Sequence, residues 1–303
     1  MMNTQILAVA VATTLFAPAA LAHEGEDYKP RIDDHAPIGV MADHYHKAGE
    51  WMASARWMTM GMNDPANIMM GPQDMDMSMA MVGVMYAPTD WVTLAAGMGF
   101  SDRSMDMIMG GMPMERSASG VTDLKLNAIF PLSTTDSSRL LFKAGVILPT
   151  GATSETDAMG NLVPLAMQPG NNSWALTPSA TYSLFGNDWS TGLQASATIW
   201  LDDASTGEKP GNIWQATAWI SKTLTENWSL STRLSYEDMG AAKGANPMSG
   251  SARERLRAYV GTNLYVVGTH RIGIEFGLPL WEDRGTNNLE TGTSLMLGWQ
   301  KAF

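Results

Sequence analysis

Methionine and histidine are the residues of this chain whose types and spacing suit chemistry. Eighteen of the 25 methionines fall between Met41 and Met114, and four of the five histidines fall within the first 46 residues. A thioether sulfur is a soft ligand that selects Cu(I), whereas an imidazole nitrogen also binds borderline metals such as zinc. The sequence therefore raises metal handling as a hypothesis, and the positions of these side chains decide it.

The methionines recur at every second position in two stretches. Residues 73–81 are Q-D-M-D-M-S-M-A-M, and residues 104–114 are S-M-D-M-I-M-G-G-M-P-M. A period of two is typical of β-strands and does not make a helical core stripe. The Asp, Ser, Gly and Pro residues between the methionines also argue against simple core filling, which is the usual role of methionine.

In two neighbouring predicted strands, 49–61 and 74–87, the non-methionine positions make the better lipid-facing side. The methionines would then face the lumen of a barrel and continue into extracellular loops at Met62, Met69, Met70 and 105–114. A register shift of one residue would place them in lipid, so packing or lipid contact stays an alternative. The candidate metal ligands are Met58, Met60, Met75, Met77, Met79, Met81, Met105, Met107, Met109, His44 and His46.

The histidines near the start of the chain are mixed with acidic residues. His44-x-His46 is a candidate imidazole pair for a borderline metal. The alternative is a solvated periplasmic tail, or a segment folded into the barrel mouth as a plug.

The composition limits the class of protein. Residues 6–16 are apolar and precede Ala20-Leu21-Ala22, which predicts a signal peptide over 1–22 and export. The chain has no cysteine, and its formal net charge is −11, which argues against nucleic acid as a partner. No segment of the expected mature chain is apolar over the roughly 18 residues of a membrane helix.

From about residue 49 the sequence alternates in twelve segments, an even number as in bacterial outer-membrane barrels. The connections after even-numbered segments are short and those after odd-numbered segments are mostly long, which predicts periplasmic turns and extracellular loops with both termini in the periplasm. The predicted strands are 49–61, 74–87, 90–101, 116–130, 138–149, 173–185, 189–201, 212–223, 227–237, 254–266, 270–281 and 290–303.

Charged residues on the predicted inner face weigh against an apolar conduit. They are Asp123, Lys125, Arg139, Lys143, Arg233, Arg255, Arg257, Arg271 and Glu275. Enzyme activity is not predicted, because His270, the one histidine of the predicted barrel, falls at a periplasmic turn. A barrel hydrolase needs a histidine beside its nucleophile at the outer rim.

Two motifs carry a resemblance to a known family. Residues 34–51, D-H-A-P-I-G-V-M-A-D-H-Y-H-K-A-G-E-W, and residues 85–91, M-Y-A-P-T-D-W, flank the first methionine-rich strands. They resemble an outer-membrane transporter family related to the meta-pathway phenol-degradation barrel proteins. The resemblance covers the chain from about Asp34 to its end and implies an outer-membrane barrel. The His and Met usage also resembles that of outer-membrane copper resistance proteins.

The sequence therefore predicts an all-β protein, an antiparallel transmembrane β-barrel of about twelve strands after a cleaved signal peptide. Its parts would be a signal peptide (1–22), a His/Asp-rich periplasmic segment or plug (23–48) and the barrel (49–303). The expected partners are outer-membrane lipid and a periplasmic metal carrier, with the oligomeric state open. The first functional hypothesis is Cu(I) passage or sequestration with no obligatory cofactor, and the alternative is a passive channel for small hydrophobic or aromatic compounds.

Overall fold

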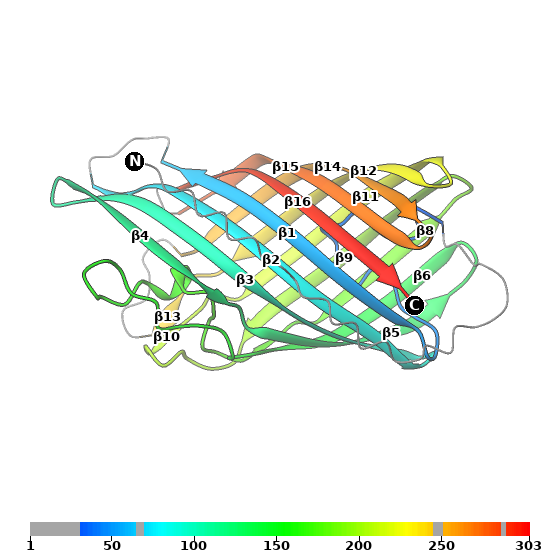
Figure 1. The fold of residues 1–303 in the computed structure, drawn as a ribbon, viewed down its shortest axis with the longest axis horizontal. Helices are drawn as coiled ribbons and strands as arrows, with labels where there is room; N and C mark the ends of the chain where they lie inside the picture. Colours follow the sequence, from blue (N-terminus) through cyan, green and yellow to red (C-terminus); the bar gives the residue numbers. More distant parts are fainter. Residues whose placement is uncertain (1–30, 65–69, 245–250, 286–288) are drawn as a thin grey trace.

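The computed structural model describes residues 31–64, 70–244, 251–285 and 289–303, and the expected signal peptide lies outside them. The described residues form a closed antiparallel β-barrel of twelve strands, which are inclined to the long axis of the molecule in Figure 1. The predicted fold class is thereby confirmed. Among the described residues, no helix has the length and apolarity needed to cross a bilayer.

Ten of the twelve wall strands are continuous, and two are interrupted once. The interruptions are at residues 122–123 and 177–178. In chain order the wall consists of β1 (Trp51–Asn63), β2 (Gly71–Thr89), β3 (Val92–Met109), β4 (Met112–Val121) with β5 (Leu124–Thr134), β6 (Ser138–Leu148), β7 (Ala175–Leu176) with β8 (Ser179–Phe185), β9 (Trp189–Trp200), β11 (Ile213–Thr225), β12 (Trp228–Met239), β14 (Arg253–Val267), β15 (His270–Asp283) and β16 (Glu290–Ala302). Outside the wall lie β10 (Glu208–Lys209), β13 (Lys243–Gly244) and the 3₁₀ turn η1 (Leu165–Met167).

The barrel closes between its first and last strands. β1 pairs with β16, and the backbone N–H of Phe303 donates to the carbonyl of Trp51 at 2.7 Å. Every strand of the wall thus has a hydrogen-bonded neighbour on both sides. A sheet that crosses a bilayer requires this, because lipid offers no partners for unpaired backbone groups. The short turns lie at the end that holds the C-terminus, on the right of Figure 1, and the long connections lie at the opposite end. This is the sorting that the sequence predicts.

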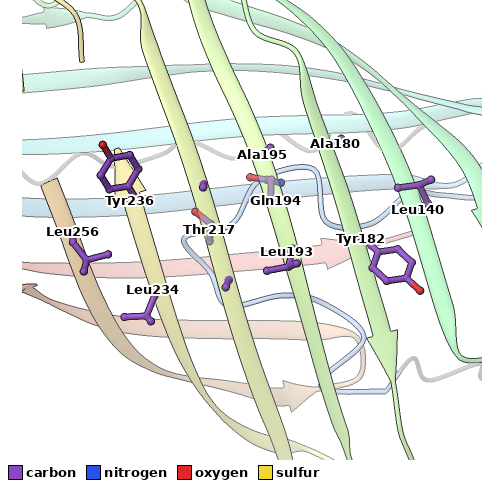
Figure 2. Close-up of a pocket in the computed structure, with 12 residues that line it drawn as sticks. Leu140, Ala180, Tyr182, Leu193, Gln194, Ala195, Thr217, Leu234, Tyr236 and Leu256 are labelled. Atoms are coloured by element: carbon purple, nitrogen blue, oxygen red, sulfur yellow. The ribbon is translucent and has the colours of Figure 1, made fainter. Parts of the chain in front are cut away.

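The outer face of the wall is apolar. Val82, Leu193 and Val260 are about 60% exposed although they are large and hydrophobic. Such a belt is stable only against hydrocarbon. Figure 2 shows a depression in this face, where leucine and tyrosine side chains of β6, β8, β9, β12 and β14 surround alanines of β8, β9 and β11.

The structure corrects the extracellular loops predicted between the third and fourth segments. β3 and β4 form one long hairpin, and the turn is Gly110-Gly111 with φ of 57° and 80°. Two glycines with positive φ fit the tight turns that match the twist of a hairpin. Met105, Met107 and Met109 are therefore strand residues, and Met62 belongs to β1. Met69 lies outside the described residues.

The pairing of the wall changes at the end of β4, where β5 begins. Along its described length β4 pairs with β3, whereas β6 pairs with β5, β7 and β8. The long connection of residues 149–174 continues from this place. Its residue Ala152 donates its backbone N–H to the carbonyl of Val121 at 2.9 Å, at the end of β4. This connection is called the cap below.

Candidate channel interior

The methionines of β1 and β2 face the inside of the barrel. On β2, Val82 and Val84 are exposed to the outside, and Met79, Met81 and Met85, which lie on the opposite face of the strand, are half-buried. Met60 is buried, and its sulfur accepts a hydrogen bond from Arg257 Nη1 on β14 at 2.9 Å. β14 is not a neighbour of β1 in the wall, so this contact crosses the lumen.

The strand register places these methionines directly opposite one another. Each methionine of β1 between 58 and 62 faces a methionine of β2. The pairs are Met58 with Met79, Met60 with Met77, and Met62 with Met75. Met81 extends this row opposite Arg56, and Met75 also pairs with Met105 on β3. We call these residues of β1 and β2 the methionine ladder.

At the end with the long connections, which is the predicted extracellular end, the ladder joins an apolar cluster that is called the extracellular cluster below. Met105 and Met107 pack with Val163 and Met167 of the cap and with Leu289 before β16. Met62, Met75 and Met114 pack against the same group. Sequence reasoning missed the cap residues and Leu289, because loop positions carry no periodicity. The apolar run Leu162-Val163-Pro164-Leu165 within a polar loop was the available signal.

The cap is tied to the wall by polar contacts. Arg103 of β3 donates through Nη1 to the carbonyl of Ala166 at 2.6 Å. Asp123, at the interruption between β4 and β5, accepts the backbone N–H groups of Gly151 at 2.9 Å and Asn171 at 2.8 Å. One buried carboxylate therefore holds both ends of the cap.

The lumen has two chemically different sides. The methionines lie on β1–β4, with Met296 of β16 opposite Met58. The charged residues predicted to face inward lie mostly on β5, β6, β12, β14 and β15. An example is the buried pair of Arg233 and Glu275, whose Nε and Oε1 are 3.0 Å apart. The sequence predicted these charges on the inner face, and the structure adds that the methionines gather on the other side of the lumen, where Arg56 lies opposite Met81 and Arg103 opposite Met77.

Residues 31–50 lie inside the barrel at the end with the short turns, and we call them the plug. Most of its apolar side chains are buried, and Ala36 and Val40 pack against Trp219 of β11, whereas Met41 is about half exposed. Ile38 lies against Gly273 and Gly298, where the absence of a Cβ leaves room for it. The sequence left open a solvated tail or a plug, and the described part of this segment occupies the lumen.

Polar contacts attach the plug to strands around the whole wall. In most of these contacts the plug contributes a backbone N–H or carbonyl group, and the wall contributes a side chain. Arg139 donates to the carbonyl of Asp34 (2.7 Å), Arg271 to that of Ala36 (2.8 Å) and Gln194 to that of Met41 (2.6 Å), Glu275 accepts the N–H of Gly39 (3.1 Å), and Thr93 accepts that of His46 (2.9 Å).

The predicted site residues thus form two groups. Met75, Met105 and Met107 meet at the extracellular cluster, and the remaining ladder methionines continue from it along the wall. Met109 is half exposed at the end of β3. His44 and His46 lie in the plug at the other end and face each other, with ring centroids 5.2 Å apart. The structure does not bring the imidazoles and the thioethers of β2 into one site.

Comparison with known proteins agrees with this architecture. No curated protein sequence matches the chain. Among solved structures, the chain is similar to the COG4313 outer membrane channel from Pseudomonas putida F1, with 16% identity over 91% of this chain and 99% of that one and a TM-score of 0.66. It is more distantly similar to the KdgM porin (11% identity, 82% and 99% coverage, TM-score 0.44) and to the CymD monoaromatic hydrocarbon channel (9%, 85% and 89%, 0.43).

These similar structures are described as channels and a porin. The resemblance to copper resistance proteins has no counterpart among them and stays a prediction. The sequence profile of a family described as "Putative MetA-pathway of phenol degradation" matches residues 60–292, most of the chain. The chain therefore belongs to this family and is an outer-membrane β-barrel.

Proposed function

We propose that this barrel is a channel for small hydrophobic or aromatic solutes, which move along its methionine-lined side. The observation that supports the proposal is the inward direction of the methionine ladder, from Met81 to the extracellular cluster. Thioethers are apolar, flexible and polarisable, and a sulfur–aromatic contact contributes about 0.3–1.5 kcal/mol. A row of such contacts binds an aromatic solute weakly at several places, as a transit path requires.

The family description supports this class of solute, and a similar structure supports a channel. The family description refers to phenol degradation, and the similar structure from Pseudomonas putida is described as an outer membrane channel. Several charged residues of the other side have partners of their own, as in the pair of Arg233 and Glu275 and the contacts of Arg139 with the plug. On the methionine side, the inward charges are arginines that lie among the methionines, such as Arg56 opposite Met81 and Arg103 opposite Met77. This side is therefore the one better suited to an apolar solute.

The test uses two substitutions at the same four positions. Met58, Met60, Met77 and Met79 are changed together to leucine in one variant and to glutamine in another. Phenol flux into liposomes that contain the mature protein is then measured. We expect the leucine variant to retain most of the flux and the glutamine variant to lose it severalfold, because leucine keeps the path apolar and glutamine does not.

Met98 supplies the matched control, because it lies on the outward face of β3 and is about 40% exposed there. Met98→Gln should leave phenol flux unchanged when the barrel folds. Wild-type phenol flux in the four-glutamine variant would contradict a path along the ladder.

Cu(I) passage is the second candidate, and the paired register of the ladder favours it. Cross-strand neighbours have Cβ atoms about 4.5–5.5 Å apart, so the two thioethers of a rung can reach one soft ion. The four-leucine variant separates the two proposals. It keeps an apolar path but removes the sulfur atoms of two methionine pairs, Met58 with Met79 and Met60 with Met77. Anaerobic Cu(I) loading should therefore fall if the ladder handles copper. A periplasmic carrier would be a partner in that case.

A further inference from the structure

Three side chains of the plug form a compact cluster of nitrogen and oxygen ligands. Ligand atoms of His35, Asp43 and His44 all lie within 4.8 Å of one another. His44 Nδ1 is 2.9 Å from Asp43 Oδ1, and His35 Nδ1 is 3.7 Å from Asp43 Oδ2. The two imidazole rings meet edge to face with centroids 4.1 Å apart. One carboxylate thus lies between two imidazoles.

The cluster is buried, and several of its nitrogens lack a partner. His44 and Asp43 are each 4% exposed, and His46 is 6% exposed. Within the part of the chain that the structure describes, His35 Nδ1, His44 Nε2 and His46 Nε2 have no hydrogen-bond partner. Buried polar atoms are normally paired, so three unpaired imidazole nitrogens in one place require an explanation. A purely structural hydrogen-bond cluster does not supply one.

The neighbouring cation does not use the ligand atoms of the cluster. Arg271 donates through Nη2 to the carbonyl of Ala36 at 2.8 Å and through Nη1 to Gln300 Oε1 at 2.6 Å. The Asp43 carboxylate therefore stays available between the two imidazoles.

We propose that His35, Asp43 and His44 bind a divalent transition-metal ion of the late first row, with Zn(II) as its representative. Two imidazoles and one carboxylate are a ligand set typical of zinc sites, with metal–ligand distances of about 2.0–2.2 Å. His46 lies next to His44 and offers a fourth nitrogen. This site differs from the thioether ladder in its ligands and in its place, so it is independent of the proposed solute path.

The ion would fasten the plug. The ligands flank the turn of residues 36–42, whose backbone contacts the wall through Ala36, Gly39 and Met41. Binding both ends of this turn fixes the shape that makes these contacts. The metal therefore stabilises the plugged form of the barrel.

The experiment measures Zn(II) retained by the mature, detergent-folded protein after dialysis and desalting, with Co(II) absorption as a second readout. We expect one equivalent in the wild type and a loss of at least tenfold in affinity in His35→Gln and in His44→Gln. Digestion with trypsin in the plug, next to Arg31 or Lys47, should be severalfold slower with Zn(II) than with a chelator, and this difference should vanish in both variants.

Two histidine variants outside the cluster are the controls. His270→Gln alters the start of β15, and His23→Gln removes the histidine at the expected mature N-terminus. Both should retain one equivalent. Heat modifiability on gels checks that each barrel has folded. A folded wild type that retains no Zn(II), or a folded His44→Gln protein that retains a full equivalent, overturns the proposal.

Discussion

At the scale of single residues, the plug fits the wall through glycines. A Cβ added at Gly298 would lie 2.5 Å from Ile38 Cδ1, and one added at Gly273 would lie 2.9 Å from Ile38 Cβ. These positions have ordinary strand backbone, so the absence of a side chain is explained by the close approach of the plug. The sequence shows the glycines but not what approaches them.

Gly298→Ala should destabilise the protein by forcing Ile38 out of its place. Overpacking of this kind costs about 1–3 kcal/mol, which urea unfolding in detergent can measure. The second substitution Ile38→Ala should restore much of the loss by making room. Gly61→Ala is the control, because its Cβ would approach Asp76 Oδ1 at 3.3 Å and is remote from Ile38. Failure of Ile38→Ala to relieve Gly298→Ala would contradict the packing argument.

The inward direction of the methionines could be predicted from the sequence, whereas the residues that they contact in the extracellular cluster could not. Alternation with valine and alanine on β2 favoured the inward direction of the methionines, because the period of a strand leaves two choices and valine and alanine suit lipid better. The strand pairing of the structure was needed to exclude the other choice. Val163, Met167 and Leu289 come from connections, where no period exists. Their contact with Met105 depends on tertiary folding, which local pattern does not encode.

At the scale of elements, the cap depends on a single carboxylate. Asp123 is buried and accepts from both ends of the cap, including Asn171 Nδ2 at 3.0 Å. The neighbouring Thr122 hydroxyl also accepts the backbone N–H of Gly99 at 2.9 Å, so the interruption between β4 and β5 is itself an ordered feature.

Asp123→Ala should release the cap while the barrel stays closed. Hydrogen bonds to a charged group are worth about 1.5–3 kcal/mol each, and three are lost together. We expect proteinase K to cut within residues 149–174 severalfold faster, as mapped by mass spectrometry. Asp136→Ala, in an exposed short turn, serves as the control and should show no change in this region. Equal cleavage of both variants would show that other contacts hold the cap.

The elements themselves were largely predictable, with one clear error. The twelve segments found by alternation correspond to the twelve wall strands. The error concerned residues 102–115, which were assigned to a loop although the methionines of 104–114 recur at every second position. A hairpin that extends beyond the membrane needs no lipid-facing side, so its outer positions, such as Asp102 and Ser104, lack the apolar residues that identify the other strands.

At the scale of the whole molecule, the apolar belt sets the position of the barrel in the bilayer. Val260 lies at the centre of β14, between Thr232 of β12 and Phe276 of β15, and is 58% exposed. Met112 lies at the tip of the long β3–β4 hairpin and is 70% exposed. Both are apolar and exposed, but only Val260 is expected to meet hydrocarbon.

Val260→Arg should therefore reduce the free energy of folding into lipid bilayers by about 2–4 kcal/mol. Met112→Arg should change it by no more than about 0.5 kcal/mol, as for ordinary surface substitutions. Folding titrations of both variants with denaturant in liposomes give the comparison. Equal penalties at the two positions would mean that the belt is not where the exposed hydrophobic side chains indicate.

The order of the methionines along the β3–β4 hairpin and the lumen has a consequence for oxidative damage. Peroxide reaching the cell meets Met112 and Met109 first, because they are exposed at the hairpin tip, whereas Met105 and Met107 are buried beneath the cap. Oxidation converts an apolar thioether into a polar, chiral sulfoxide. The methionines at the tip can be oxidised without altering the interior, whereas sulfoxide formed on the ladder would make an apolar part of the lumen polar and hydrated.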